Sequence, residues 1–467
     1  MRVAAASLSF ALLLAGCPKP TPQGPPQTPC IVPGVSHEAR CLSLEVPENP
    51  DRPNGRKLSI HAAIVPATGI RPLKDPVFVF AGGPGQSATE VAGMVMPLFS
   101  ALEARRDIVF IDQRGTGESA PLGCLDDVKR RPLKDSADDE KNAALLVECR
   151  DGFTDAGIDL AQYATWVAMR DFDAMRAALG YETINLWGAS YGTRAAMEYA
   201  RQFPQHVRSV VIDGVAPAMR PLPVALAFDT DLALDQVLAR VDGGVKSALE
   251  AVLAPDAGVI RVNDPYFGTP TELRLERKRR VGMVRGPLYG PMLAAALPVA
   301  LERAAAGDWT ALVGLGSGLG GGKLYAGMHF SVLCAEDVPR ITDADRTSVA
   351  STRAGTTFIE EYERACKGWP VREVPKAYFD PPTFTAPTLI LSGGADPATP
   401  PRHAAEVART LPNATHFVAP QLGHGVSSIG CAPMLVHTFI TKASANGLDA
   451  GCLEAIPAPT FFEAPTP

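Results

Sequence analysis

Three residues far apart in the chain have the types and surroundings that nucleophilic catalysis by serine requires. The first is Ser190, which lies in the sequence Gly188-Ala189-Ser190-Tyr191-Gly192. A short apolar stretch precedes this G-x-S-x-G pattern, and a helix-like run follows it at residues 194–202. A strand, a sharp turn and a helix in that order would hold a serine hydroxyl clear of the carboxyl end of a sheet. The five residues alone also fit an ordinary glycine-rich turn, so the interpretation depends on the rest of the chain.

A serine hydroxyl needs a base to remove its proton, and a histidine paired with a carboxylate serves as one. His424 lies between two glycines after the last expected strand, and it is the predicted base. Asp396 lies in the loop after the preceding strand and is the predicted acid that orients the imidazole. Asp213, also at a strand end, is the main alternative for the acid, and Asp396 before Pro397 also fits a simple turn.

The negative oxygen that develops during such a reaction needs hydrogen-bond donors, each of which contributes about 3 kcal/mol. We expect one donor to be the backbone N–H of Tyr191, which follows the nucleophile. The second is expected from the turn at Gly82 and Gly83, which follows a buried strand. Arg114 lies after the next strand, and we expect it to have a structural role by pairing with a carboxylate.

The elements that must position these residues alternate between strands and helices. Continuous apolar runs indicate strands that are buried on both faces. Helices are expected at residues 163–179 and 402–410, on either side of the segment described next. Strands are expected at residues 42–46, 57–65, 76–81, 108–111, 183–187, 207–212, 387–391 and 414–418. This alternation predicts an α/β fold with a mostly parallel, doubly wound sheet.

Between residues 217 and 381 the pattern changes to long helical stretches with no clear buried strand. Residues 225–241 and 291–306 read as helices, and the basic run at 274–280 reads as a solvated helix face. We therefore predict a mainly helical cap inserted into the α/β core. The predicted division is a signal peptide (1–17), a tether (18–36), the first part of the core (37–216), the cap (217–381) and the second part of the core (382–467).

The composition describes an ordinary globular protein. The 467 residues are 46% hydrophobic and carry a net charge of −6, so there is no basic surplus for binding nucleic acid. The sequence contains no C-x-x-C pattern and no cluster of Cys and His, so we expect neither a metal nor another cofactor. Composition leaves the oligomeric state open.

The N-terminus has the features of an export signal. Arg2 precedes an apolar stretch that is too short to span a bilayer comfortably, and Leu14-Ala15-Gly16-Cys17 resembles a bacterial lipoprotein signal. We expect Cys17 to be lipidated and to become the new N-terminus, with a plain signal peptide as the alternative. Residues 18–33 are rich in Pro, Gln and Thr and would form an extended tether. The expected location is the bacterial cell envelope, on the periplasmic or surface side of a membrane.

The cysteine count agrees with export. Without Cys17 the nine cysteines leave eight, an even number, which suits disulfides in an oxidising compartment. They fall into four couples that are local in sequence, and we predict pairing within each couple, although sequence alone leaves other pairings open. The predicted pairs are Cys30–Cys41, Cys124–Cys149, Cys334–Cys366 and Cys431–Cys452.

As a set, the motifs resemble the proline iminopeptidase branch of the α/β-hydrolases, and more closely its secreted tripeptidyl-aminopeptidase-like members. The resemblance spans about residues 42–452 and includes the lead-in helix at 170–181 and the cysteines at the ends of the cap and core. It implies an α/β-hydrolase fold with the catalytic order Ser190, Asp396, His424. Ala81 and Ala189 depart from the usual His and Gly; the first weakens the case for strict prolyl specificity. The motifs are Gly82-Gly83-Pro84-Gly85, Asp112-Gln113-Arg114-Gly115-Thr116-Gly117-Glu118-Ser119, Gly188-Ala189-Ser190-Tyr191-Gly192-Thr193, Val211-Ile212-Asp213-Gly214 and Gly423-His424-Gly425.

An aminopeptidase of this kind must hold a free ammonium group at a fixed distance from Ser190, and buried carboxylates do this well. Glu336 and Asp337, next to Cys334 in the expected cap, are the candidates, since the resemblance places this acidic pair near the site. An exposed acidic turn without a binding role is the alternative.

The sequence therefore predicts an exported, lipid-anchored serine aminopeptidase that forms an acyl-enzyme and releases short N-terminal units from peptides. A carboxylesterase with the same three residues is the main alternative, and a non-catalytic binding lipoprotein of this fold is a further one. Dehalogenase and epoxide hydrolase chemistry is disfavoured, because those enzymes use Asp where this chain has Ser190.

Overall fold

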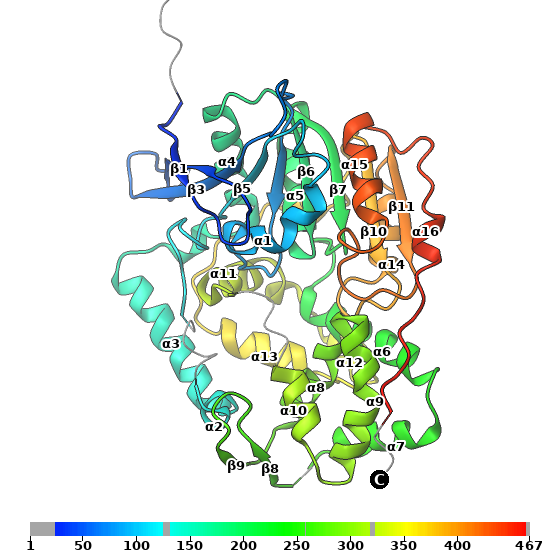
Figure 1. Ribbon diagram of the computed structural model, residues 1–467. Helices are drawn as coiled ribbons and strands as arrows, with labels where there is room; N and C mark the ends of the chain where they lie inside the picture. Colours follow the sequence, from blue (N-terminus) through cyan, green and yellow to red (C-terminus); the bar gives the residue numbers. More distant parts are fainter. Residues whose placement is uncertain (1–23, 125–130, 257, 318–322, 464–467) are drawn as a thin grey trace, which may run out of the picture.

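The computed structural model describes residues 24–124, 131–256, 258–317 and 323–463; Cys17 therefore lies outside the described residues. A nine-stranded sheet in the order β1-β2-β3-β5-β4-β6-β7-β10-β11 forms the upper half of the molecule (Figure 1). The six strands from β5 to β11 are parallel, and β1, β2 and β3 extend one edge in antiparallel pairs. This arrangement confirms the predicted mostly parallel sheet. The strands are β1 (Thr28–Cys30), β2 (Ala39–Pro47), β3 (Lys57–Val65), β4 (Val77–Phe80), β5 (Ile108–Ile111), β6 (Ile184–Ala189), β7 (Val207–Asp213), β10 (Thr388–Gly393) and β11 (Ala414–Ala419).

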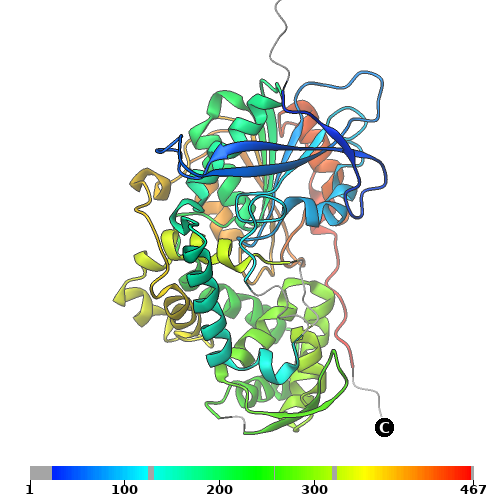
Figure 2. The same ribbon diagram turned by 90° about the vertical axis from the view of Figure 1, so that its left-hand side faces the viewer.

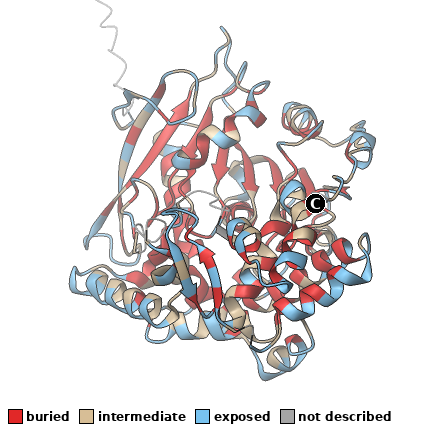
Figure 3. Cartoon of the chain, turned by 60° about the horizontal axis from the view of Figure 1, so that its bottom comes forward, coloured by how far each residue is buried: buried red, intermediate tan, exposed pale blue. Residues whose placement is uncertain are grey.

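Helices cover both faces of the sheet, which is why its central strands are apolar throughout. In β4, Phe78 and Phe80 pack with the helices of one face, whereas Val77 and Val79 pack with those of the other. The central strands are buried along most of their length, whereas the outer strands β1, β2 and β11 are partly exposed (Figure 3). One face is covered by α4 (Thr165–Ala178), α5 (Tyr191–Gln202) and α14 (Pro401–Ala408), and the other by α1 (Ala88–Phe99), α15 (Ala432–Lys442) and α16 (Gly451–Glu454).

The chain between β7 and β10 is mainly helical and has a hydrophobic core of its own. It lies below the sheet in Figures 1 and 2. Both predicted helices are present, and the structure adds one hairpin that the sequence did not indicate. Its short strands bury only alternate residues, such as Ile260 and Val262, so they lack a continuous apolar run. The elements are α6 (Leu222–Leu238), α7 (Gly243–Val252), β8 (Ile260–Asn263), β9 (Pro270–Leu273), α8 (Arg277–Arg285), α9 (Pro291–Ala305), α10 (Thr310–Ser317), α11 (Ala326–Glu336), α12 (Asp343–Val349) and α13 (Thr357–Cys366).

Two helices that precede β6, the strand that leads into the turn at Ser190 (the elbow), also pack on this helical segment: α2 (Leu133–Ser136) and α3 (Asp139–Asp155). The backbone N–H of Leu133 donates to Asp264 at 2.5 Å, and Asp139 pairs with Lys278 at 2.5 Å and with Arg279 at 2.8 Å. Charged contacts of this kind join segments more than 100 residues apart, and a sequence pattern does not reveal them.

Four disulfides join the same couples of cysteines that are neighbours in sequence: Cys30–Cys41, Cys124–Cys149, Cys334–Cys366 and Cys431–Cys452. Each links residues of one local region and not distant parts of the chain. None of the helices in the described residues is long and apolar enough to cross a membrane.

Arg114 connects the loop after β5 to α4 and to two neighbouring segments. Its guanidinium forms a bidentate ion pair with Asp171 of α4, with both N–O distances at 2.7 Å, and also donates to the carbonyls of Glu48 and Gln162. Burial by itself would lower the pKa of Arg114, but the charge and hydrogen bonds of Asp171 raise it. The two charges are therefore compensated in the interior, as expected for a structural role.

We predict that Arg114→Met destabilises the protein by about 3–5 kcal/mol, because it leaves the Asp171 charge buried and unpaired. The midpoint of urea unfolding measures this loss. The double variant Arg114→Met/Asp171→Leu removes both charges and should recover much of it. A single variant as stable as the wild type would show that the pair is not structural.

Candidate active site

Ser190 occupies the turn between β6 and α5 with φ 56° and ψ −127°, a left-handed backbone that residues with a side chain rarely adopt. The residue stands at the N-cap of α5, yet its side chain makes no capping hydrogen bond. The side-chain oxygen of a serine at this position usually accepts a hydrogen bond from a backbone N–H of the first helical turn. With this backbone conformation the Ser190 hydroxyl does not cap α5.

The two glycines of the motif are required by close packing, since neither has a positive φ. A Cβ on Gly188 would lie 2.3 Å from the carbonyl oxygen of Gly192, and a Cβ on Gly192 would lie 2.1 Å from that of Phe80. The helix start therefore presses directly against the ends of β6 and β4. The sharp turn itself is made by Ser190, which has the positive φ.

His424 and Asp396 form the predicted pair. Nδ1 of His424 lies 2.8 Å from Oδ2 of Asp396, a carboxylate that is fully buried. The second oxygen of Asp396 accepts from the backbone N–H groups of Ala398 and Thr399, at 2.8 and 2.9 Å. Thr399 also donates its hydroxyl to Oδ2 at 2.7 Å and lies 3.1 Å from the imidazole. These contacts fix the orientation of the carboxylate.

The protonation of this pair follows from its surroundings. Burial by itself would raise the pKa of Asp396, but the His424 charge and the hydrogen bonds from His424 and Thr399 lower it to about 2. Burial would likewise lower the pKa of His424, but the charge and hydrogen bond of Asp396 raise it above its ordinary value. With these shifts the carboxylate is charged at neutral pH and favours protonation of the neighbouring imidazole.

The three predicted residues border one short piece of backbone at the end of β7. The N–H of Ser190 donates to the carbonyl of Asp213 at 2.9 Å. A Cβ added to the next residue, Gly214, would lie 3.5 Å from Oδ2 of Asp396 and 3.6 Å from Cε1 of His424. Parallel strands bring their carboxyl ends to one edge, and the elbow, the acid and the base meet there.

Asp213, the alternative acid, has a different function. Its Oδ2 accepts from the N–H groups of Val426 and Ser427, both at 2.7 Å, and from the Ser427 hydroxyl at 2.5 Å. Burial raises the pKa of Asp213, and these hydrogen bonds oppose the rise. Asp213 therefore holds the segment that follows His424 in place, whereas Asp396 contacts the imidazole.

The predicted donors lie next to the serine. Tyr191 is the first residue of α5, so its N–H has no acceptor within the helix. Its hydroxyl is held by Gln113 at 3.0 Å and Thr165 at 2.7 Å. A Cβ on Gly82 would lie 3.4 Å from Cβ of Ser190, so the Gly82-Gly83 turn passes directly beside the nucleophile. Gly83 has φ 108°, a conformation that explains the glycine there.

Glu336 and Asp337 are fully buried, so they are not an exposed acidic turn. Asp337 forms a bidentate pair with Arg194 of α5, at 2.8 and 3.2 Å. Glu336 lies 3.5 Å from the same guanidinium and accepts from the backbone N–H of Thr165 at 2.7 Å and from the hydroxyl of Tyr378 at 2.5 Å. This arrangement does not support the predicted binding of a substrate ammonium group, which would have to displace Arg194.

Sequence reasoning missed several residues that shape the site. Thr399 follows Asp396 by three residues, and that spacing could have indicated a carboxylate that caps a turn. Arg194, one helical turn after Ser190, carried no signal of its buried partners. Tyr289 was also missed: its carbonyl accepts from the N–H of His424 at 2.9 Å, and its ring packs edge-on to the imidazole at 5.0 Å.

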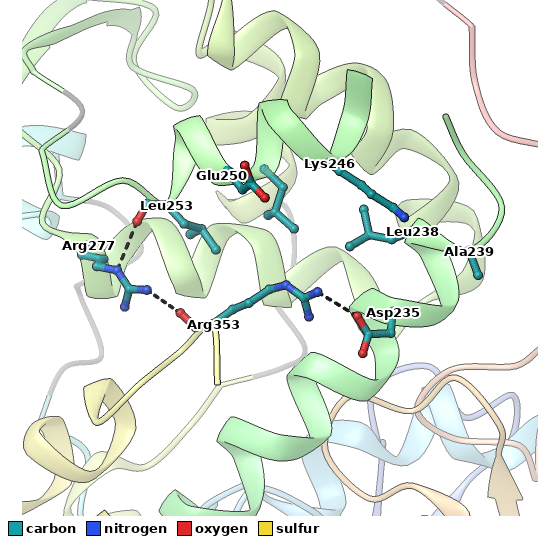
Figure 4. A pocket seen from close by; sticks show the side chains of 9 residues that line it. Asp235, Leu238, Ala239, Lys246, Glu250, Leu253, Arg277 and Arg353 are labelled. Carbon is teal, nitrogen blue, oxygen red and sulfur yellow. Dashed lines mark hydrogen bonds and ion pairs between the residues drawn. The ribbon is translucent and has the colours of Figure 1, made fainter. Parts of the chain in front are cut away.

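Two cavities lie away from these residues. The one in Figure 4 measures about 530 Å³ and lies among α6, α7 and α8, lined by residues such as Asp235, Lys246 and Arg353. It contains none of the predicted site residues. A larger cavity of about 730 Å³ lies among α3, α8 and α13. Within the described residues, no group of three or more His, Cys, Asp or Glu side chains is arranged to hold a metal ion.

The family follows from this fold and from a direct comparison. The model of the α/β hydrolase fold family matches residues 75–428, which include Ser190, Asp396 and His424. The chain belongs to this family and is a serine hydrolase.

Named relatives are similar over most of the chain. A tripeptidyl aminopeptidase of Streptomyces coelicolor is 26% identical over 458 residues, covering 88% of this chain and 83% of that protein. The serine protease Hip1 of Mycobacterium tuberculosis is 28% identical and covers 80% of this chain and 79% of its own. Carboxylesterase B of the same organism is 32% identical over a shorter region, 48% of this chain and 50% of the relative. The resemblance to tripeptidyl-aminopeptidase-like serine peptidases is thus confirmed.

We predict that Gly192→Ala lowers the rate at which a fluorophosphonate labels the protein by about 10²-fold, because an added Cβ must move α5 and Ser190 away from β4. Gel fluorescence over time measures the rate. Gly314→Ala is the matched control, since a Cβ there meets no atom within 4 Å. Equal labelling of both variants would contradict the packing account of the elbow.

Proposed function

We propose that the protein is an exported serine aminopeptidase that releases short N-terminal units from peptides through Ser190, His424 and Asp396. The observation that carries this proposal is the hydrogen bond from His424 to buried Asp396, formed beside the backbone that also receives the N–H of Ser190. The same edge of the sheet thus carries the hydroxyl, carboxylate and imidazole that acyl transfer requires, in the chain order of this fold.

In the proposed reaction Ser190 Oγ attacks the scissile carbonyl while Nε2 of His424 removes the hydroxyl proton. Asp396 keeps the other ring nitrogen protonated and stabilises the imidazolium. The negative oxygen of the intermediate accepts from the N–H of Tyr191 and from an N–H of the Gly82-Gly83 turn. His424 then gives its proton to the leaving amine, and water hydrolyses the acyl-enzyme by the same steps.

The peptide substrate is supported by the relatives named tripeptidyl aminopeptidase and serine protease, whose similarity extends over most of the chain. None of the predicted site residues lines the cavity of about 730 Å³, but one of its lining residues is next to a contact with the glycine turn. It includes Phe330, whose neighbour His329 contacts the carbonyl of Pro84 in the glycine turn at 2.8 Å. A carboxylesterase remains the second candidate, favoured by the carboxylesterase among the relatives.

Export is supported by the four disulfides, which persist in oxidising compartments. We propose that Cys17 carries the lipid anchor and that residues 18–27 tether the enzyme to the cell envelope. The predicted tether at 18–36 was too long, because β1 (Thr28–Cys30) pairs with β2 in the sheet and Val32 is buried. We propose the same division of the remaining chain as the sequence predicted, with a core in two parts and a cap at residues 217–381.

The substrate class is tested by a panel of aminoacyl, dipeptidyl and tripeptidyl amides beside simple esters. We expect the wild type to cleave one class of amide with a higher kcat/KM than the esters, and Ser190→Ala to lose this activity by at least about 10⁴-fold. Cleavage of esters alone would identify a carboxylesterase. Failure of Ser190 to react with a fluorophosphonate would favour a non-catalytic binding protein.

The pH dependence follows from the raised pKa of His424. Neutral imidazole is the active base, so we expect kcat/KM to fall as the pH decreases through a pKa above the ordinary value of about 6.5. Asp396→Asn removes the charge that raises this pKa. It should reduce activity by about 10⁴-fold and move the acid limb of the residual activity to lower pH.

The control for the pH profile is Asp256→Asn, which removes an exposed carboxylate of the helical segment and should leave the profile unchanged. An acid limb at the same pH in Asp396→Asn and in the wild type would contradict the pairing of Asp396 with the catalytic base.

A further inference from the structure

We propose that Arg285 binds a carboxylate group of the substrate beside the catalytic centre. This inference rests on the proposed function and adds a substrate feature to it. Arg285 is the last residue of α8, and the short turn after it leads to Tyr289, whose carbonyl accepts from the N–H of His424. The arginine is thus attached to the segment that contacts the catalytic base.

Aromatic groups hold the guanidinium in place without neutralising it. It lies over the ring of Tyr289 at 4.9 Å from the centroid, and over that of Phe358 at 5.6 Å. One terminal nitrogen donates to the Tyr289 hydroxyl, and the buried Nε has no hydrogen-bond partner. Among the residues that the structure describes, no carboxylate forms an ion pair with Arg285. The side chain is therefore positioned, charged and short of acceptors.

Other arginines removed from solvent in this protein are compensated. In the described chain the five buried arginines all have strong acceptors. Arg280 donates to four backbone carbonyls, and the other four pair with carboxylates: Arg106, Arg114, Arg176 and Arg194. Arg285 is half-buried, and within the described chain the phenol of Tyr289 is its one hydrogen-bond acceptor. A missing acceptor at a fixed cation is what a site for an anionic ligand provides.

Arg285 is connected to the catalytic base through Tyr289, so its charge lies on the substrate side of the molecule. The Tyr289 ring, on which the guanidinium rests, is itself packed against the imidazole of His424 at 5.0 Å. Toward the other end of α8, Lys278 and Arg279 line the cavity of about 730 Å³. Arg285 follows Lys278 by seven residues and so lies on the same side of the helix. It lies at the end of α8 that leads to Tyr289 and the catalytic base, whereas Lys278 and Arg279, at the other end, line the cavity.

The difference between these three cations is their pairing. Lys278 and Arg279, which line the cavity, both form ion pairs with Asp139, so their charges are partly neutralised. Arg285 has no such partner. A substrate carboxylate would gain most from binding at Arg285, where the planar guanidinium can donate two parallel hydrogen bonds. Two parts of a peptide supply this group: the free C-terminus of a short peptide, or an Asp or Glu side chain.

Two matched substrate pairs distinguish these sources. The first pair is penta-alanine with a free C-terminal carboxylate and the same peptide as its C-terminal amide. The second pair is Ala-Ala-Asp and Ala-Ala-Asn 4-nitroanilide. We expect the wild type to prefer the charged member of one pair by about tenfold in kcat/KM, mainly through KM. In Arg285→Gln this preference should fall to about one.

The controls separate binding from folding. Arg274→Gln removes an exposed cation of the same helical segment and should keep the wild-type preference. If Arg285→Gln does not fold, Arg285→Lys keeps the charge without the planar fork, and it should lose part of the preference. A wild type without preference in either pair would overturn the proposal. So would an Arg285 variant that weakens both members of a pair equally.

Failure of the carboxylate site and failure of the aminopeptidase proposal give different experimental results. If no amide is cleaved but esters are, the aminopeptidase proposal fails. The carboxylate proposal is then tested with 4-nitrophenyl hydrogen glutarate and its neutral methyl ester. The same preference, and its loss in Arg285→Gln, would support the site on an esterase, and equal rates for the two esters would overturn it.

Discussion

The left-handed backbone of Ser190 costs a residue with a side chain about 1–3 kcal/mol, so the surrounding structure has to hold it. The parallel pairing of β4, β6 and β7 places the strand that leads to it, and the carbonyl of Asp213 receives its N–H. Gly188 and Gly192 let α5 begin in contact with the sheet. The predicted oxyanion donors and Asp213 lie around Ser190, because Tyr191 follows it in the chain and because the Gly82-Gly83 turn and Asp213 lie at the ends of the neighbouring strands β4 and β7.

A second constraint couples the elbow to the helical segment. Arg194 projects from α5 into a fully buried cluster with Glu336 and Asp337, and Asp337 also accepts from the N–H of Leu222 at the start of α6. Removing one charge from such a cluster leaves the others unpaired in a medium of low dielectric, which is strongly unfavourable. The helical segment and the nucleophile helix are thus held in register by a charge network. Tyr289 makes a comparable link to the base.

The sequence predicted the sheet well, because strands buried on both faces are continuous apolar runs that end in polar or glycine-rich turns. Its order of Ser190, Asp396 and His424 led to the pair that the structure brings together, since strand ends in a parallel sheet share one edge. The burial and pairing of Glu336 and Asp337 could not be predicted, because nothing near them in sequence indicates that Arg194 reaches them. The uncompensated charge of Arg285 likewise depends on distant residues and has no sequence signal. The β8–β9 hairpin was missed because its strands are short and half-exposed.

The central claim is that Ser190, His424 and Asp396 act as one unit at the edge of the sheet. Its most direct test is a crystal structure of the protein after reaction with a fluorophosphonate. We predict phosphorus bonded to Ser190 Oγ, an adduct oxygen about 2.7–3.1 Å from the N–H groups of Tyr191 and the Gly82-Gly83 turn, and His424 Nε2 at hydrogen-bond distance from the adduct, with its Nδ1 still on Asp396. An adduct on another residue, or an imidazole turned away from Ser190, would contradict it.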